Sequence, residues 1–498
     1  MNFFEKYDRQ FTRLLEITPA LASWTLLTLP LWASFLWPIA VANFIIIFDL
    51  YFFYRAAHLG VNSVRAYRKI QKTSKIGWWD KGVAENLPME KTHHLIIIPT
   101  YKEPMTILKR TFTFLSAQEM PTKNISICLA GEAREEEFLT KSAELKKEYG
   151  HFFANIWITQ HTLVEGEVAG KSSNLAFSAH ILQEKLKETT IDTDNLLVTS
   201  CDADVAIHPK YFSNLSYQFL TSAHPYQRFW QAALLFYNNI WRVPMPVRVI
   251  HTIYSIQQVA DLMRPKSNFN YSTYSTSWKL VEKAGFWDTD VIAEDWHLFF
   301  KCFFVSKGEV EVDSVFLPLF ADAAEGPTYM QSLMTQYSQN RRWAWGVTDI
   351  AYAFKQFLKQ RKEISKTNFL FRFLRVLEQH ILWPVNWWII TLGATLPLLI
   401  NPAFRYTVYG QNLPKVSGFI LTISTVFILS IIVVDYLLKP PRPVTFKKRM
   451  LPLTIAQYLL MPVTAFLFGA LPGMDAHTRL LLGKRLEYKV TPKQDHQS

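Results

Sequence analysis

Cysteine and charge are both scarce in this chain. Its 498 residues include three cysteines, Cys128, Cys201 and Cys302, which are far apart, odd in number and without metal-ligand spacing. The pattern favours reduced, buried thiols in a cytosolic block over a disulfide framework or a zinc site. Charged residues make up 19% and aromatic residues 15% of the chain. We therefore expect a membrane protein with a sizeable soluble part and two or three domains.

The sequence contains no internal repeat, no low-complexity tract and no obvious appended sensor domain. Its net charge of +12 could indicate a nucleic-acid partner. However, the basic residues cluster beside apolar stretches, which suits anionic lipid headgroups better. We expect membrane lipids as partners and no nucleic acid.

Two apolar runs near the N-terminus, 21–37 and 39–54, are each about long enough to span a membrane. The first thirteen residues are charged and lack a small-residue cleavage site, which argues against a removed signal peptide. Seven basic residues follow between Arg55 and Lys81, so the positive-inside rule places that side in the cytosol. The sequence predicts a transmembrane hairpin over 1–58.

Three further apolar runs, 381–400, 416–438 and 451–471, predict a C-terminal transmembrane region over 377–475 and a cytosolic tail over 476–498. By the positive-inside rule, the basic loop 439–449 and the basic tail should both be cytosolic. A single crossing by 451–471 would put them on opposite sides of the membrane. Pro452 and Pro462 favour a bent or re-entrant segment there, so the count is four or five spans. Asp49 and Asp435 are either functional intramembrane carboxylates or groups at cytosolic helix ends.

Strands and helices alternate between the membrane regions. Apolar runs predict buried strands at 94–99, 125–129, 155–159 and 196–200, with helices at 106–116, 133–149 and 172–187 between them. This alternation predicts an open α/β sheet over a soluble domain at 83–345. Ligands of such sheets bind at the carboxyl ends of the strands. A basic amphipathic stretch, 352–375, predicts that interfacial helices occupy 346–376.

The sequence CDAD at 201–204 directly follows a predicted strand. Mg²⁺ and related hard cations prefer carboxylate oxygens as ligands, and they are often bound by one or two protein carboxylates together with substrate phosphates. Asp202 and Asp204 are therefore candidate metal ligands. Cys201 fills core space beside them.

The sequence GKSSN at 170–174 opens a predicted helix. A helix N-terminus with a lysine can hold a phosphate, and Lys171 is the candidate for that role. The alternative is an ordinary helix start capped by Ser172 or Ser173.

Four short signatures follow one another along the soluble block: IIIPTYKE at 96–103, CDAD at 201–204, AEDW at 293–296 and QNRRW at 339–343. In this order they resemble a membrane-bound family 2 glycosyltransferase of the cellulose-synthase-like kind, over roughly 94–345 and the flanking spans. The resemblance implies a GT-A type nucleotide-sugar-binding domain with an open mixed sheet. It also implies that Mg²⁺ or Mn²⁺ holds a nucleotide-diphosphate sugar.

The resemblance also implies roles for single residues. Asp295 is the base that deprotonates the attacking hydroxyl, and Glu294 orients the acceptor. Gln339, Arg342 and Trp343 form the Q-x-x-R-W signature, in which the arginine neutralises the leaving diphosphate. Donor-binding residues at the first strand, the second strand and the lysine segment are Thr100, Tyr101, Glu103, Glu132 and Lys171, with Asp202. For Glu294 and Asp295, the alternative is an acidic pair favoured at the start of a helix. For the Q-x-x-R-W signature, the alternative is a basic, aromatic helix at the membrane interface.

One position departs from the family pattern. Family 2 enzymes usually carry an aspartate pair after the second strand, where this chain reads LAGEAR at 129–134. Glu132 is the acidic candidate there, so the identity of the nucleotide stays open. His93, His161 and His297 lie near the motifs without a partner at ligand spacing, and we interpret them as structural.

We expect an inverting glycosyltransferase that extends a polysaccharide, in the cell membrane with its catalytic domain in the cytosol. Two alternatives remain: transfer of one sugar to a membrane lipid, and a non-catalytic glycosyltransferase-like scaffold. The missing aspartate motivates the last. The acceptor is accordingly a glycan or a lipid.

Overall fold

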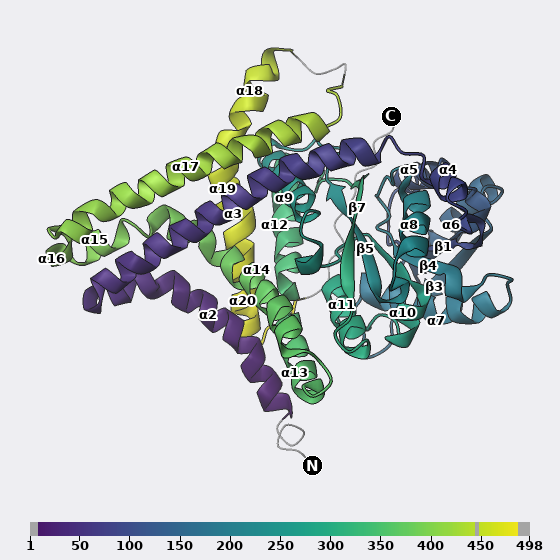
Figure 1. Ribbon diagram of the computed structural model, residues 1–498, viewed down its shortest axis with the longest axis horizontal. Helices are drawn as coiled ribbons and strands as arrows, with labels where there is room; N and C mark the ends of the chain where they lie inside the picture. The colour runs from purple at the N-terminus through teal and green to yellow at the C-terminus, as the bar shows by residue number, and fades with distance from the viewer. Residues whose placement is uncertain (1–7, 444–447, 487–498) are drawn as a thin grey trace.

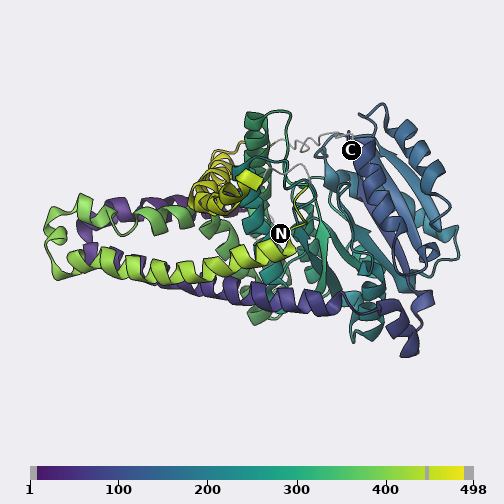
Figure 2. The same cartoon turned by 90° about the horizontal axis from the view of Figure 1, so that it is seen from above.

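Long helices and a mixed sheet occupy opposite ends of the molecule (Figures 1 and 2). The computed structural model describes residues 8–443 and 448–486. The start of the expected N-terminal hairpin, part of the expected basic loop and the end of the expected tail lie outside the described residues.

The sheet has seven strands in the order β3-β2-β1-β4-β6-β5-β7. Strands β1 to β4 are parallel, β6 is antiparallel to β4 and β5, and β5 and β7 are parallel. The strands are β1 (His93–Pro99), β2 (Ile125–Glu132), β3 (Asn155–His161), β4 (Leu196–Ser200), β5 (Arg228–Leu235), β6 (Tyr274–Ser277) and β7 (Glu311–Phe320). The four strands predicted from the apolar runs are confirmed, and so is the open mixed sheet. On β1, Ile96 and Ile98 enter one core cluster while Leu95 and Ile97 enter another, because neighbouring side chains point to opposite faces.

Helices cover the sheet on both sides (Figure 2). The helices of this part of the chain are α4 (Trp78–Ala84), α5 (Met105–Ser116), α6 (Phe138–Tyr149), α7 (Lys171–Lys187), α8 (Tyr211–Thr221), α9 (Met245–Asp261), α10 (Trp278–Lys283), α11 (Glu294–Val305) and α12 (Tyr329–Ala344). Short helices connect them: η1 (Met89–Lys91), η2 (Thr122–Asn124), η3 (Thr193–Asn195), η4 (Pro225–Gln227), η5 (Pro265–Ser267) and η6 (Trp345–Thr348). The helix predicted over 133–149 starts only at Phe138, because the Glu135 carboxylate accepts hydrogen bonds from Lys102 N and Lys141 Nζ and holds 133–137 as a turn.

The remaining helices lie outside this domain. They are α2 (Asp8–Leu36), α3 (Pro38–Thr73), α13 (Asp349–Gln360), α14 (Lys366–Leu392), α15 (Leu396–Ile400), α16 (Pro402–Arg405), α17 (Val408–Leu438), η7 (Lys448–Met450), α18 (Leu451–Ala456), η8 (Gln457–Leu460), α19 (Met461–Ala465), η9 (Phe466–Ala470) and α20 (Leu471–Leu481). Among the described residues, four helical stretches are long and apolar enough to cross a membrane: Asp8–Leu36, Pro38–Thr73, Val408–Leu438 and Leu451–Leu481.

The stretch 352–375 forms parts of two helices. The first, α13, ends at Gln360, and α14 begins after Ser365, whose Oγ accepts from Asn368 N and caps the new helix. One prediction about the connecting segments is wrong. The run 381–400 is not one span, because α14 ends at Leu392 and α15 restarts with Pro397 in its first turn.

Asp49 and Asp435, in the long apolar helices, connect these helices to neighbouring segments. Asp49 accepts a hydrogen bond from Ser417 Oγ at 2.6 Å and so joins α3 to α17. Asp435 accepts from Tyr237 Oη at 2.6 Å and Lys439 Nζ at 2.5 Å, which ties the end of α17 to the loop after β5. These contacts favour the helix-end interpretation for Asp435 and an interhelical contact for Asp49.

The stretch Leu451–Leu481 is bent into several short helices, including the π-helical η9. Near its start, Gln457 Oε1 accepts from Arg248 on α9 at 3.4 Å. Near its end, Asp475 pairs with Arg341 on α12 at 2.9 Å. Both ends therefore contact the α/β domain, which is the arrangement expected of a bent segment.

Candidate active site

Two neighbouring cavities lie at the carboxyl ends of the parallel strands. The smaller, of about 150 Å³, is lined by the strand-end and α12 residues predicted for the site: Thr100, Tyr101, Glu103, Glu132, Lys171, Asp202, Asp204, Gln339, Arg342 and Trp343. The larger, of about 430 Å³, is lined by Glu294 and Asp295. Lys171, Asp202, Ser272, Arg342 and Trp343 border both. The structure thus brings every predicted site residue to one place, where sheets of this kind bind ligands.

The turn after β1 is held by its own glutamate. Glu103 Oε2 accepts from Thr100 Oγ1 at 2.8 Å and from Tyr101 N at 2.6 Å. Glu132, at the end of β2, is buried and pairs with Arg134, whose guanidinium lies 4.7 Å from the Tyr101 ring centroid. The charge of Glu132 is therefore balanced within the cavity wall.

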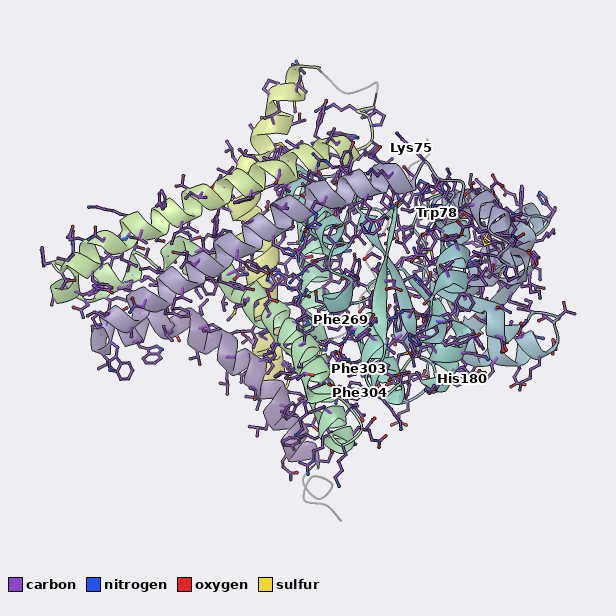
Figure 3. The ribbon with its side chains drawn as sticks, in the orientation of Figure 1. Lys75, Trp78, His180, Phe269, Phe303 and Phe304 are labelled. Atoms are coloured by element: carbon purple, nitrogen blue, oxygen red, sulfur yellow. The ribbon has the colours of Figure 1, made fainter. Side chains whose placement is uncertain are left out.

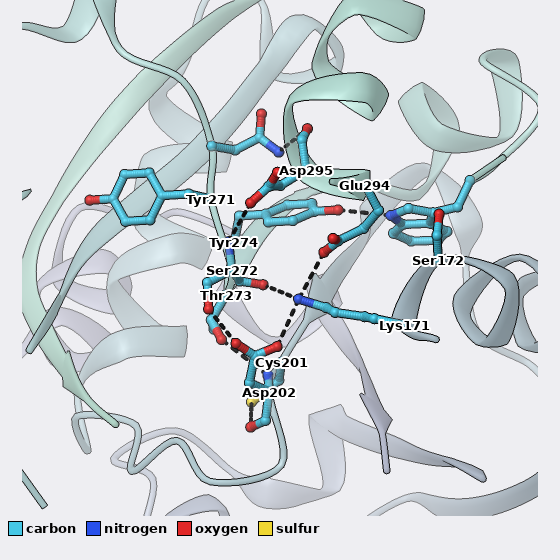
Figure 4. Close-up of polar contacts among 12 residues, drawn as sticks. Lys171, Ser172, Cys201, Asp202, Tyr271, Ser272, Thr273, Tyr274, Glu294 and Asp295 are labelled. Carbon is cyan, nitrogen blue, oxygen red and sulfur yellow. Dashed lines mark hydrogen bonds and ion pairs between the residues drawn. The ribbon is translucent and has the colours of Figure 1, made fainter. Parts of the chain in front are cut away.

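Lys171 lies between two carboxylates (Figure 4). Its Nζ is 2.7 Å from Asp202 Oδ1 and 2.8 Å from Glu294 Oε1, and it donates to Ser272 O at 2.5 Å. Burial alone would lower the pKa of Lys171, but Asp202 and Glu294 outweigh burial and raise it well above the usual value. The ammonium is therefore permanently charged and links the two cavities.

Asp204 faces a different partner from Asp202. Its Oδ2 accepts from Asp322 N at 3.1 Å, and its side chain is buried, whereas the Asp202 side chain is 32% exposed. Both aspartates line the smaller cavity. Among the described residues no three His, Cys, Asp or Glu side chains form a metal-binding group. The pair still fits Mg²⁺ or Mn²⁺, because such ions usually take one or two protein carboxylates and complete their shell with substrate phosphates and water.

Asp295 sits in the first turn of α11, next to Glu294, the first residue of the helix. Its Oδ2 accepts from Ser272 N at 3.0 Å and its Oδ1 from Trp296 N at 2.9 Å. Asn270 Nδ2 donates to the Asp295 carbonyl oxygen at 2.9 Å. Two backbone donors therefore fix the carboxylate in the larger cavity.

Burial changes the acidity of both residues. It raises the pKa of Glu294 to about 7, which Lys171 opposes and Asp295 reinforces. Burial also raises the pKa of Asp295, although hydrogen bonding by Ser272 and the charge of Lys171 lower it. An elevated pKa makes a carboxylate a better proton acceptor near neutral pH.

This acidity predicts a pH dependence. A raised pKa means that the carboxylates gain protons as pH falls, and a protonated base cannot accept another. We expect the turnover rate to decrease as pH falls, and the decrease should begin above the ordinary aspartate pKa of about 3.9, because the pKa of Asp295 is raised. A pH–rate profile at saturating substrate tests this. A flat wild-type rate down to about pH 4 would contradict the assignment.

His297 joins three segments around α11. Its Nδ1 is 2.8 Å from Asp349 and its Nε2 is 2.8 Å from Asp288. Burial would lower its pKa, but the bonds to Asp288 and Asp349 raise it to about 9. The imidazolium thus holds Asp288 at the end of the turn 285–288, where Gly285 and Phe286 have φ of 74° and 61°. The structural interpretation of His297 agrees with these contacts.

Alternate faces of α12 have different partners. Gln339, Arg342 and Trp343 line the smaller cavity, and Gln339 Oε1 is buried without a hydrogen-bond partner in the described part of the chain. On another face, Asn340 donates to Phe468 O and Arg341 pairs with Asp475. The α12 helix therefore directs Gln339, Arg342 and Trp343 toward the smaller cavity, while its other face packs against η9 and α20.

Sequence reasoning missed Ser272. Its amide donates to Asp295, its hydroxyl to Asp202, and its carbonyl accepts from Lys171. It has φ of 55°, an unusual conformation for serine that is typical of functional sites. No sequence motif marks it. His380, Trp383 and Tyr254, which line the larger cavity, were also missed.

The family model described as glycosyl transferase family group 2 matches residues 197–438. No curated protein sequence matches the chain. Among solved structures, a mannosyltransferase from Pyrobaculum calidifontis, in complex with GDP-Man and Mn²⁺, is 14% identical with a TM-score of 0.42, covering 76% of this chain and 99% of that one. S. aureus TarS 1–349 in complex with UDP-GlcNAc is 12% identical with a TM-score of 0.31, covering 68% and 90%.

The matched model and the mixed sheet define a glycosyltransferase with a GT-A type fold. Within that class, the chain is similar to family 2. The enzyme class and the fold class that the resemblance implies are confirmed. The cellulose-synthase-like type and the single-residue roles stay predictions.

Proposed function

We propose that this protein is an inverting membrane glycosyltransferase that transfers a sugar from a nucleotide-diphosphate sugar to a growing polysaccharide. One observation carries the proposal: Asp295 lies in the larger cavity, and Arg342 and Asp202 border both that cavity and the smaller one. A donor and an acceptor bound in adjoining cavities would meet at this shared wall.

The smaller cavity suits the donor. Arg342 can neutralise the diphosphate, and Thr100, Tyr101 and Glu132 lie where the nucleoside would be held. Asp202 and Asp204 would hold Mg²⁺ or Mn²⁺, which when bound supplies positive charge to the diphosphate. Lys171 keeps Asp202 and Glu294 in place through its two ion pairs.

The reaction is a single displacement. The acceptor hydroxyl oxygen forms a bond to the anomeric carbon, and the bond from that carbon to the diphosphate oxygen breaks. Asp295 takes the hydroxyl proton, and the nucleoside diphosphate leaves with the bonding electron pair beside Arg342. One displacement inverts the anomeric configuration.

The alternative acceptor is a membrane lipid that receives one sugar. Among the described residues only four helical stretches could span a membrane, and one of them is bent with both ends on the catalytic domain. A small set of spans is compatible with a single-transfer enzyme. The basic residues from Arg55 to Lys81 support a cytosolic catalytic domain in either case.

Product analysis separates the two functions. Purified protein in lipid is supplied with Mg²⁺ or Mn²⁺ and a labelled nucleotide sugar. We expect label in a glycan that precipitates in alcohol and is shortened by glycosidases. Label that extracts into organic solvent as a single-sugar lipid would favour the alternative. The metal chelator EDTA should abolish incorporation, and restoration by added Mn²⁺ or Mg²⁺ is the control.

A further inference from the structure

The bent segment, Leu451–Leu481, carries apolar side chains on its outer side. Four of them recur every four residues and form an apolar stripe: Ile455 is 66% exposed, Leu459 81%, Val463 50% and Leu467 38%. A contiguous exposed apolar surface commonly marks a contact with a membrane or with a partner. The stripe is therefore a candidate interaction surface.

The inner side of the bent segment is polar. Thr454, Gln457 and Thr464 are buried, and Gln457 Oε1 accepts from Arg248 on α9 at 3.4 Å. A helical segment with water on its outer side normally turns its apolar side toward the protein and its polar side outward. Here the two sides are exchanged, which is the pattern of a segment that packs on the protein through polar groups and faces lipid with its other side.

The bent segment does not follow the direction of the long helices. The helices α3 and α17 lie side by side, and α3 leads to the α/β domain, where Lys75 and Trp78 come directly after it (Figure 3). The bent segment runs across these two helices in Figure 1 and is seen nearly end-on in Figure 2. If α3 and α17 cross a membrane, the bent segment lies along its surface.

Both ends of the bent segment contact the α/β domain. Near the start, Gln457 contacts α9, and near the end Asp475 pairs with Arg341 of α12 at 2.9 Å. Between these points, Asn340 of α12 donates to Phe468 O. A helix that crossed the hydrocarbon core, which is about 30 Å thick, would carry one end away from the domain. These contacts are therefore incompatible with a full crossing.

Basic residues flank the bent segment on both sides. Arg449 lies just before it, Lys484 and Arg485 lie just after it, and all three are exposed. Basic flanks favour the cytosolic side of a membrane, and a single crossing would put these two flanks on opposite sides. The charges therefore favour a segment whose two ends lie on the same side.

We propose that the bent segment lies along the membrane surface on the side of the α/β domain, where its apolar stripe inserts among lipids. The inference rests on the membrane location in the proposed function and adds a lipid-binding surface to it. The other side of the same segment contacts α12 through Asn340 and Arg341. A lipid-bound segment thus supports the helix that carries Arg342.

The test measures the depth of spin labels in vesicles of phosphatidylcholine and phosphatidylglycerol. Nitroxides are attached to the full-length variants Ile455→Cys, Leu459→Cys and Val463→Cys, one at a time. The three native cysteines are buried, and the unsubstituted protein gives the background. Depth follows from relaxation by oxygen, which is enriched in lipid, relative to relaxation by a water-soluble nickel chelate. We expect the three labels at one depth, about 5–10 Å into the boundary between headgroups and acyl chains. A crossing helix would separate the first and last labels by up to about 12 Å.

The matched controls are Val426→Cys, Leu429→Cys and Val433→Cys on α17, which are exposed apolar positions like those of the stripe. Their depth should change steadily, by up to about 1.5 Å per residue. A steady change from Ile455 to Val463 overturns the inference, and so do three labels that the nickel chelate reaches as readily as it reaches a label in water. No change of depth along α17 would refute the membrane location in the proposed function, and the inference with it.

Discussion

Asp295→Asn is expected to lower the rate of sugar transfer by about 10²–10⁴-fold, the usual contribution of a general base. The amide has the same shape, and its oxygen can still accept from Ser272 N or Trp296 N. The fold and donor binding should therefore persist while proton acceptance is lost. Initial rates of transfer, with donor affinity measured separately, test this.

Asp290→Asn is the matched control for that prediction. Asp290 is exposed and belongs to the loop that leads to α11, outside both cavities. It should transfer sugar at the wild-type rate. Equal rates for Asp295→Asn and wild type would show that another group takes the proton.

Arg342→Ala is expected to reduce the transfer rate by about 10²–10³-fold, as removal of one charge-stabilising donor typically does. Arg342 borders both cavities at the place where the diphosphate would leave. The effect should appear in kcat, because the leaving charge develops in the transition state. Steady-state kinetics with varied donor measure it.

The neighbouring arginine supplies a stringent comparison. Arg341 lies on another face of α12 and pairs with Asp475, each about one quarter exposed. Arg341→Ala should cost about 0–1 kcal/mol of stability and leave kcat within a few-fold of wild type. A larger kcat loss in Arg341→Ala than in Arg342→Ala would reverse the assignment of the two faces.

The sequence predicted the half of the sheet that local pattern determines. Strands β1 to β4 are short apolar runs, and their ends carry the motifs that meet in the smaller cavity. Strands β5 to β7 could not be predicted from local sequence, because they are stabilised by pairing with segments far along the chain. In the structure, β6 pairs with β4 and β7 pairs with β5. Helix ends were missed where side chains such as Glu135 capture the backbone.

The residues of the smaller cavity were more predictable than those of the larger one. Thr100, Asp202 and Arg342 belong to motifs with a fixed order. Ser272 belongs to no motif. Its φ of 55° directs its amide to Asp295, its hydroxyl to Asp202 and its carbonyl oxygen to Lys171. His380 lies on a helix outside the soluble block, so only tertiary packing could place it beside Asp295.

Nucleotide release from the purified protein in lipid, across a panel of nucleotide-diphosphate sugars with Mg²⁺ or Mn²⁺, tests the central claim most directly when Asp295→Asn is measured alongside. The account predicts metal-dependent release with one donor, lost in Asp295→Asn. Release that persists in Asp295→Asn, or no release with any donor in the presence of glycan and lipid acceptors, would contradict it.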